Sequence, residues 1–126
     1  MSDYAQVKTA LTYIKKLNKP IESIINAAGI ALMNLAIMTP KNTTEKLINT
    51  NLLGTIYCSQ LFAPLMIRKK TGIIINFSTI AVSLGLKGES IYTASKAGVE
   101  GFTRTFAREM ADFNIRVNCI APGPIN

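Results

Sequence analysis

The stretch Tyr92-Thr93-Ala94-Ser95-Lys96 places a phenol and an ammonium four residues apart. On a helix these two side chains share one face and can meet over a bound molecule. The spacing alone decides nothing, because it recurs at Tyr4 and Lys8 on a segment with nothing reactive before it. The stretch at Tyr92 instead follows the continuous apolar run 72–77 and the hydroxyl pair Ser78-Thr79. It therefore predicts a helix that follows a buried strand and carries a proton donor.

Three further segments are candidates for the rest of the site. The run Ile21-Glu22-Ser23-Ile24-Ile25 is typical of a buried strand, and it breaks at Asn26-Ala27-Ala28-Gly29, where small side chains let a ligand approach the backbone. Asn51 lies inside a long helical pattern, where an amide is a poor choice unless it binds a partner. The segment Ile115-Arg116-Val117-Asn118-Cys119-Ile120 predicts another strand, which ends in Ala121-Pro122-Gly123-Pro124.

The periodicity predicts the order of the elements along the chain. Helices are expected over 4–17, 41–70 and 91–112, strands over 22–26, 72–78 and 115–120, and loops over 30–39 and 80–90. Asp3 is the expected N-cap of the first helix, with Gln6 closing a capping box. Pro40 is expected at the first position of the second helix, which is long enough to bend near Asn51 or Gly54. Strands that alternate with helices predict a parallel sheet with right-handed crossovers.

In these motifs the chain resembles the short-chain dehydrogenase/reductases over nearly its whole length. Asn-Ala-Ala-Gly, the helix Asn, the strand followed by Ser-Thr, Tyr-x-x-x-Lys and Pro-Gly occur in the family's order. Among the subgroups it is most similar to the 3-oxoacyl-[acyl-carrier-protein] reductases, through 26–30, 50–54, and 115–118 with 121–123. The resemblance implies an α/β fold, a partial Rossmann-like, doubly wound parallel sheet of three strands with flanking helices. Residues 1–126 are expected to form a single partial NAD(P)-binding domain.

The resemblance also implies a role for each matching residue. Tyr92 would be the general acid and Lys96 would stabilise its phenolate and bind the nicotinamide ribose, while Thr79 would polarise the carbonyl. Asn51 would hold a water in a proton relay. The residues expected to contact the cofactor are Asn26, Ala27, Gly29, Tyr92, Lys96, Pro122, Gly123 and Ile125. The expected cofactor is NADP(H) in preference to NAD(H), and the expected reaction is reduction of a carbonyl.

Thr79 departs from the family pattern, which has Ser at the carbonyl-polarising position. The hydroxyl is kept, with an added methyl group and a stiffer rotamer. Ser78 is not an equivalent substitute, because neighbouring residues of a strand point to opposite faces. We therefore expect Thr79 to serve, with altered substrate tolerance.

The composition excludes several kinds of site. The chain has no histidine, which excludes Ser-His and Cys-His nucleophiles and most zinc sites, so no metal site is expected. Cys58 and Cys119 each lie alone in an apolar run, which is typical of buried reduced thiols. No apolar run approaches the roughly 20 residues that span a bilayer. The start Met1-Ser2-Asp3 does not resemble a signal peptide, so we expect a cytoplasmic protein.

The net charge of +7 is dispersed, and no aromatic residues are interleaved to stack on bases, so no nucleic-acid partner is expected. A basic surface suits an acidic partner. The resemblance implies a small-molecule or acyl-carrier-protein-tethered carbonyl substrate and a homodimer or homotetramer. Association is expected through the helices around 41–68 and 92–111. Val99, Phe102, Phe106 and Met110 recur at helical spacing, which suits either that association or a sheet-facing core.

One part of the family pattern has no match. A dinucleotide-binding fold begins with a strand and a Gly-rich turn on the pyrophosphate, and neither Gly85-x-x-Gly88 nor Gly98-x-x-Gly101 lies between a strand and a helix start in the way that a phosphate cradle requires. Against the pattern, the chain starts near the third helix and stops after Pro-Gly, so we expect it to bind no cofactor tightly and to be inactive alone. Two alternatives remain open. The chain could be a non-catalytic association module, or its substrate could be a sugar, steroid or small alcohol.

Overall fold

The computed structural model describes residues 3–124. Its helices and strands, in chain order, are α1 (Tyr4–Lys16), β1 (Ser23–Asn26), η1 (Ala36–Met38), α2 (Lys41–Ile48), η2 (Asn49–Leu53), α3 (Gly54–Lys69), β2 (Gly72–Phe77), α4 (Ala81–Leu84), α5 (Ser90–Ala111) and β3 (Ile115–Ile120). The Asp3 carboxylate caps α1 by accepting from the amide of Ala5 at 2.9 Å, as expected. Two short helices were not expected, because η1 and α4 lie inside the segments predicted as loops. Pro40 is the N-cap of α2 rather than its first residue.

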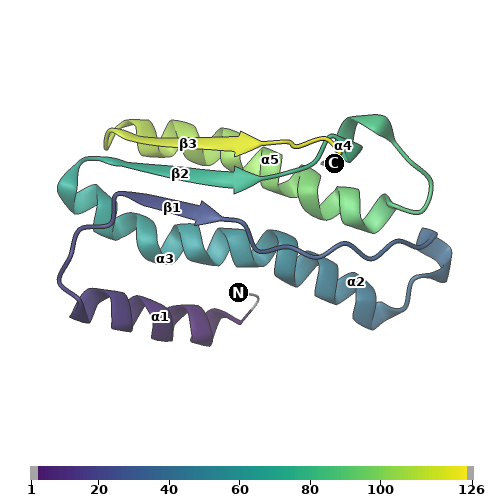
Figure 1. Ribbon diagram of the computed structural model, residues 1–126, viewed down its shortest axis with the longest axis horizontal. Coiled ribbons are helices and arrows are strands. Elements are labelled where there is room, and N and C mark those ends of the chain that lie inside the picture. Colours follow the sequence, from purple (N-terminus) through teal and green to yellow (C-terminus); the bar gives the residue numbers. More distant parts are fainter. Residues whose placement is uncertain (1–2, 125–126) are drawn as a thin grey trace.

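The three strands form one parallel sheet in the order β1-β2-β3, so the predicted parallel sheet is confirmed. The register pairs Ser23 with Ile73 on one side of β2 and Gly72 with Ile115 on the other. All three arrows run in one direction in Figure 1, with α4 and α2 beyond their carboxyl ends. The ends of parallel strands meet at one edge, which is where open α/β sheets bind ligands.

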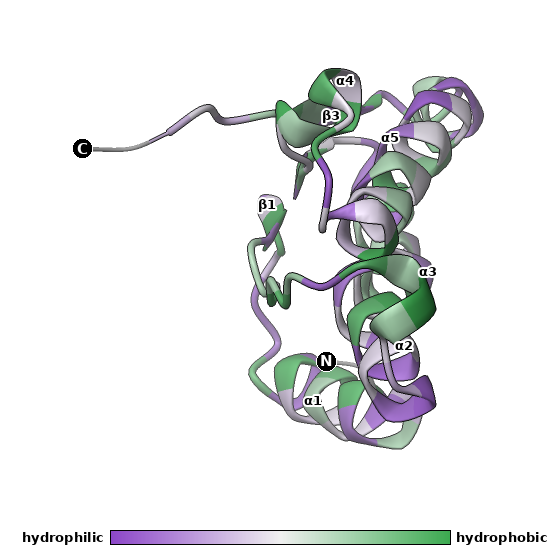
Figure 2. Ribbon diagram, turned by 90° about the vertical axis from the view of Figure 1, so that its right-hand side faces the viewer, coloured by the Kyte–Doolittle hydropathy of each residue, from purple (hydrophilic) through white to green (hydrophobic). Residues whose placement is uncertain are grey.

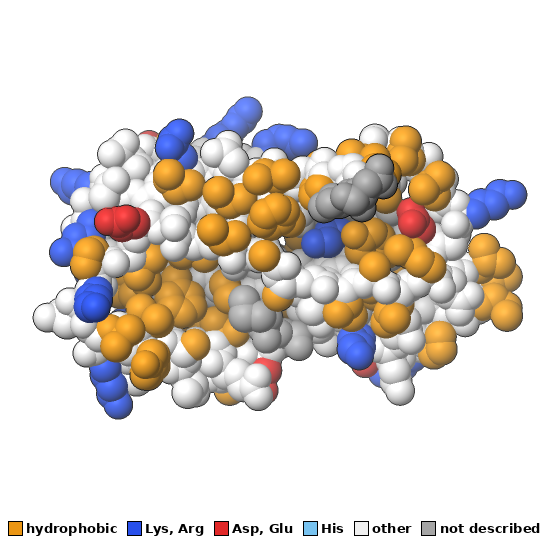
Figure 3. All heavy atoms as spheres, viewed as in Figure 1, with side chains coloured by type: hydrophobic (Ala, Val, Ile, Leu, Met, Phe, Trp, Pro, Cys, Tyr) orange, Lys and Arg blue, Asp and Glu red, His pale blue; other side chains and the backbone are white. Residues whose placement is uncertain are grey.

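Helices cover one face of this sheet. Figure 2 shows α5, α3 and α1 in a layer on one side of the strands, with no helix on the other side. Along β2, Ile74 and Asn76 are buried against the helices, while Ile73, Ile75 and Phe77 alternate with them and are half-buried. Figure 3 looks at the face that the helices leave open, where hydrophobic side chains gather.

The core lies between the sheet and the two long helices. Its buried residues are Ala63, Met66, Ile74, Phe106, Met110, Ile115 and Val117. Phe102 packs against them and stacks on Phe106 with ring centroids 5.0 Å apart. Phe106 and Met110 of the apolar stripe of α5 therefore belong to the sheet-facing core, with Phe102 half-buried against it, whereas association through these helices stays a prediction. Cys58 is buried as expected, whereas Cys119 is only half-buried.

The long helical pattern from 41 contains a wide turn. Residues Asn49–Leu53 form the π-helical turn η2 between α2 and α3, and the amide of Gly54 donates to the carbonyl of Asn49. A π turn thus interrupts the helix at the place where a bend was expected. Single π turns inside α-helices occur frequently at functional sites.

Candidate active site

Lys96 is held at the carboxyl end of β2. Its ammonium Nζ donates to the carbonyl of Phe77, the last residue of that strand, at 3.1 Å. The side chain is only 8% exposed. Burial lowers the pKa of Lys96 below its ordinary value of 10.5, and the nearby Cys119 thiol opposes this effect. The structure thus places a nearly buried amine where the sheet ends.

Asn51, in η2, connects a loop to α5 through its side chain. Its Oδ1 accepts from the amide of Ile30 at 2.8 Å, and its Nδ2 donates to the carbonyl of Ile30 at 2.8 Å and to Ser95 Oγ at 3.0 Å. Ser95 in turn donates to the carbonyl of Tyr92 at 2.6 Å. Both amide protons of Asn51 are used within the protein. Any water bound at Asn51 would therefore have to donate to one of its oxygen atoms.

Gly29 lies over both of these side chains. A Cβ built at this position would come 3.2 Å from Lys96 Nζ and 3.3 Å from Asn51 Oδ1. The surrounding residues Ala27 and Ala28 are exposed and carry only methyl groups. The backbone of Gly29, which carries no side chain, therefore lies next to the Lys96 amine and the Asn51 amide, although the three residues are far apart in the sequence.

The two candidate hydroxyls are free to donate. Within residues 3–124 the Tyr92 hydroxyl makes no hydrogen bond, and the side chain is half-buried. Thr79 Oγ1 accepts from the amide of Ala81 at 3.2 Å, and no described residue accepts its hydrogen. Ser78 differs, because it is buried and donates to Glu100 Oε1 at 2.6 Å. Ser78 and Thr79, which both follow the end of β2, therefore have different hydrogen-bond partners.

The Pro-Gly segment lies beside Thr79. The carbonyl of Pro122 accepts from the amide of Ile80 at 3.2 Å, and a Cβ at Gly123 would meet Ile80 Cδ1 at 3.4 Å. The helix α4 that follows Ile80 contacts α5, which carries Tyr92. Ile125, an expected cofactor contact, lies outside the described residues.

Asn26 is engaged elsewhere. Its side chain is buried and donates to Asn76 Oδ1 at 2.8 Å and to Ser59 Oγ at 3.4 Å. Asn76 continues this network by donating to Thr103 Oγ1 at 2.9 Å. The Asn26 side chain therefore connects β1 to β2, α3 and, through Asn76, α5 within the core.

Comparisons with known proteins decide the family. The family model of the short chain dehydrogenases matches residues 1–126. The chain belongs to the short-chain dehydrogenases. It is 37% identical over 123 residues to the 3-oxoacyl-[acyl-carrier-protein] reductase FabG of Thermotoga maritima, covering 98% of this chain and 50% of that protein. It is 39% identical over 111 residues to FabG of Chlamydia pneumoniae, covering 88% and 44%. The predicted family is thus confirmed.

Two solved structures support the fold. ElxO with NADP bound superposes with a TM-score of 0.92 at 35% identity, covering 99% of this chain and 51% of that chain. A short-chain dehydrogenase from Streptomyces avermitilis superposes with a TM-score of 0.94 at 22% identity, covering 99% and 46%, which supports the fold alone. The chain therefore spans about half the length of the relatives it matches.

The residues present fit one end of a nicotinamide dinucleotide. A buried ammonium that lies beside an exposed, side-chain-free backbone suits ribose hydroxyls, which need donors and close approach. Lys96, Gly29 and Tyr92 would hold this end, and the bound cofactor would supply a hydride. Within residues 3–124 no group of His, Cys, Asp and Glu could hold a metal ion. None of the described helices has the length and apolar character to cross a membrane.

Sequence reasoning missed two residues that contribute to this candidate site or to the network beside it, Ser95 and Asn76. Ser95 lies inside the Tyr92–Lys96 stretch, but its bond to Asn51 depends on a helix turn 44 residues away. The position of Ser95, three residues after Tyr92 on the buried side of α5, was the available signal. Asn76 carried a similar signal, since an amide inside an apolar strand needs a partner.

Gly29→Ala should lower activity with little loss of stability, because the new methyl group presses on the tip of the Lys96 side chain and on the Asn51 amide. The flexible Lys96 side chain can retreat, which keeps the fold but moves the ammonium. Gly101→Ala is the matched control, since a Cβ there meets nothing within 4 Å. Steady-state rates of both variants, measured in a chimera in which residues 1–126 replace the matched segment of the Thermotoga maritima reductase, and thermal melts check this. Equal rates for the two would contradict it.

Lys96 should also make stability depend on pH. Because its pKa is lower in the folded protein, the unfolded chain binds more protons between that lowered pKa and 10.5. The free-energy cost of burying the protonated Lys96 side chain is fully present below this pH range and disappears as the pH rises through it. In Lys96→Met the free energy of unfolding should therefore rise less steeply with pH than in the parent chain. Urea titrations of both proteins at several pH values measure the two slopes. Identical slopes would contradict a lowered pKa of Lys96.

Proposed function

We propose that this chain is the catalytic part of an NADP(H)-dependent carbonyl reductase. The observation that carries the proposal is the convergence of Gly29, Asn51 and Lys96 at the carboxyl end of β2, with Tyr92 one helical turn before Lys96. ElxO, which was solved with NADP bound, shares the fold at 35% identity and supports the choice of cofactor. In this proposal residues 1–126 are a single partial NAD(P)-binding domain.

Each residue has a proposed part in the chemistry. Tyr92 donates its phenolic proton to the carbonyl oxygen, which gains negative charge as the carbon is reduced. Thr79 donates a second hydrogen bond to the same oxygen and polarises it. Lys96 binds the ribose and, while protonated, favours the phenolate left behind. Asn51 positions α5 through Ser95 and offers an oxygen to a water that returns the proton.

The proposed substrate is a 3-oxoacyl chain tethered to acyl carrier protein. Two relatives named as 3-oxoacyl-[acyl-carrier-protein] reductases support it, at 37% and 39% identity. The net charge of +7 suits an acidic carrier domain, by steering its approach. A cytoplasmic homodimer or homotetramer completes the proposal.

A chimera tests it directly. Residues 1–126 would replace the matched segment of the Thermotoga maritima reductase, so that the rest of that protein surrounds them. Oxidation of NADPH would be followed with a 3-oxoacyl thioester, and in parallel with a sugar, a steroid and a small ketone. We expect reduction of the thioester. A folded chimera that binds NADPH yet reduces only another substrate would overturn the substrate class, and one that reduces none would overturn the function.

Substitutions in the same chimera separate the two hydroxyls. Thr79→Ser should be tolerated or improve the rate, because the donor remains and the methyl group is lost. Thr79→Val should reduce kcat by about 10²-fold or more, the range reported for a lost oxyanion donor. Ser78→Ala should change kcat little, since its hydroxyl bonds Glu100 instead. The kcat values of the three variants check this. A large loss in Ser78→Ala and a small one in Thr79→Val would place the catalytic hydroxyl at Ser78.

A further inference from the structure

Positive charge is concentrated where α1 and α3 end. The last turn of α1 carries Lys15 and Lys16, and the last turn of α3 carries Arg68 and Lys69. Both helices end at the left of Figure 1, and Figure 3 shows lysine and arginine side chains along the same end of the molecule. In the part of the chain that the structure describes, the only ion pair lies within α2, so these four cations have no carboxylate partner. Each helix C-terminus supplies about half a negative charge, which leaves most of their charge uncompensated.

A groove lies between these two helix ends, with a volume of about 320 Å³. Part of its lining is apolar and half-buried, namely Ile14, Ile21 and Leu65. Another part consists of exposed cations, which are Lys15, Lys19, Arg68 and Lys69. Among the described residues that line the groove there is no aspartate or glutamate. The groove therefore joins an apolar surface to a positively charged one.

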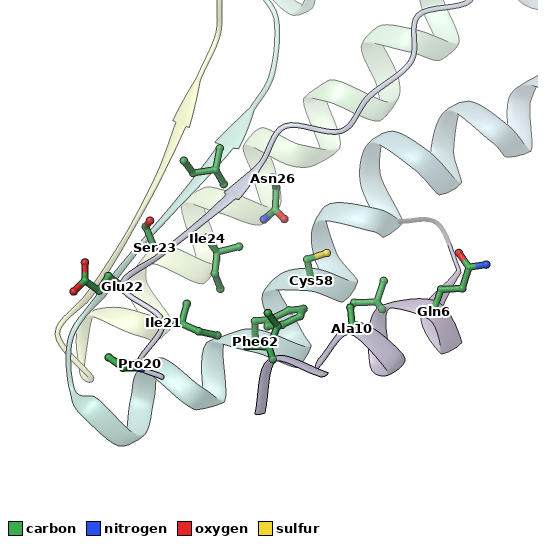
Figure 4. A pocket seen from close by; sticks show the side chains of 13 residues that line it. Gln6, Ala10, Pro20, Ile21, Glu22, Ser23, Ile24, Asn26, Cys58 and Phe62 are labelled. Atoms are coloured by element: carbon green, nitrogen blue, oxygen red, sulfur yellow. The ribbon is translucent and has the colours of Figure 1, made fainter. Parts of the chain in front are cut away.

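The wall of the groove on the side of the sheet is fixed in place. Asn18 has a φ of 51°, in the left-handed region, and turns the chain at the end of α1 toward β1. Pro20 and Ile21 follow, and Ile21 packs against the core. Figure 4 shows Ile21 pointing toward Phe62 of α3, with Pro20 beside it. A wall that is already ordered lowers the entropy cost of binding a ligand.

We infer that this groove binds a small amphiphilic anion, an apolar chain that ends in a carboxylate or a phosphate. The charged end meets Arg68 and the lysines, and the chain covers Ile14, Ile21 and Leu65. The volume is at the lower end of the range of about 300–1,000 Å³ that is usual for small-molecule pockets. A folded protein partner would need a contact of about 800 Å² on this chain, which is more than one groove of this size offers.

The inference goes beyond the proposed function. The groove precedes the first residue of β1, at the amino ends of the parallel strands, whereas Lys96 binds the last residue of β2. The two sites therefore lie at opposite edges of the sheet, and binding in the groove requires neither a cofactor nor turnover.

Titration calorimetry of the 126-residue chain, with probes below their micelle-forming concentrations, tests the inference. The probes are decanoate and decyl phosphate, which carry the two kinds of charged end on the same chain. Decanol lacks the charge, decyltrimethylammonium reverses it, and acetate and inorganic phosphate lack the chain. We expect saturable one-to-one binding of decanoate or decyl phosphate that weakens as NaCl is added, and the tighter of the two identifies the charged end.

Three results would overturn the inference. The first is no binding of either alkyl anion. The second is equally tight binding of decanol or decyltrimethylammonium, because the charge would then play no part. The third is tighter binding of polyglutamate than of both alkyl anions, because the partner would then be an acidic protein.

Paired variants locate the bound anion. Arg68→Glu should weaken binding by about tenfold or more, because it reverses a charge that lines the groove. Arg108→Glu is its matched control, since Arg108 is also exposed in the last turn of a helix but does not line the groove. Leu65→Ser should weaken binding by about threefold or more through lost apolar contact. Leu61→Ser, also half-buried on α3 but outside the groove, should not. Circular dichroism verifies that each variant is folded, and equal effects within either pair would contradict the groove.

Discussion

Tyr92→Phe should lower carbonyl reduction in the chimera by about 10²–10⁴-fold, the usual contribution of a positioned acid. The substitution removes the transferable proton and little else, because the Tyr92 hydroxyl makes no hydrogen bond within residues 3–124. The carbonyl of Tyr92 still accepts from Ser95, so the link to Asn51 is kept. Single-turnover rates with saturating NADPH would measure the loss at the chemical step.

The affinity for NADPH serves as the control for this variant. It should stay within about a few-fold of the parent chimera, since Lys96 and Gly29 are unchanged. Tyr4→Phe is a second control, because that residue has the same spacing to a lysine but lies on α1, where its ring contacts Tyr57. Activity of Tyr92→Phe within about tenfold of the parent would refute the assignment of the acid.

The 126-residue chain alone should bind neither NADPH nor NADH with useful affinity and should reduce no ketone. A pyrophosphate needs several backbone amides at a helix N-terminus. The described glycines with positive φ, Gly85 and Gly88, lie between α4 and α5 rather than between a strand and a helix. Loss of two charge-assisted hydrogen bonds of about 1.5–3 kcal/mol each corresponds to about 10²–10⁴-fold in affinity.

Titration of nicotinamide fluorescence against the chain and against the chimera measures this difference. The chimera is the positive control, since it contains the remaining half of a reductase. Saturable binding to the isolated chain in the low micromolar range would contradict the prediction. It would mean that the end of the site built by Lys96 and Gly29 suffices for binding.

Local patterns were enough to predict most of the fold. The strand 72–77 is a nearly continuous apolar run, which is typical of the strands of a parallel sheet. The requirement that an amide inside a helix must bind something pointed to Asn51, and the structure supplies Ile30 and Ser95 as its partners. In both cases the physical signal lies within a few residues of the feature it predicts.

The remainder depends on distant partners. The turn formed by Asn26 suggested a ligand contact, but its side chain reaches Asn76, which is 50 residues away and becomes a neighbour only when β1 pairs with β2. Thr103 completes that network from a third element. α4 has only four residues, too few for a helical period to appear in the sequence.

Because the π turn η2 lies between α2 and α3, the number of residues in this helical segment matters for the site as much as their identity does. Deleting one residue between 49 and 53 would let the helix close into regular α geometry, which is locally more favourable. Because a π turn takes up one extra residue, the deletion would change where the side chains inside the turn point more than it would rotate the flanking helices. Asn51 would then turn away from Ile30 and Ser95. A gene shortened by one codon in this segment would therefore yield a smoother helix without its site.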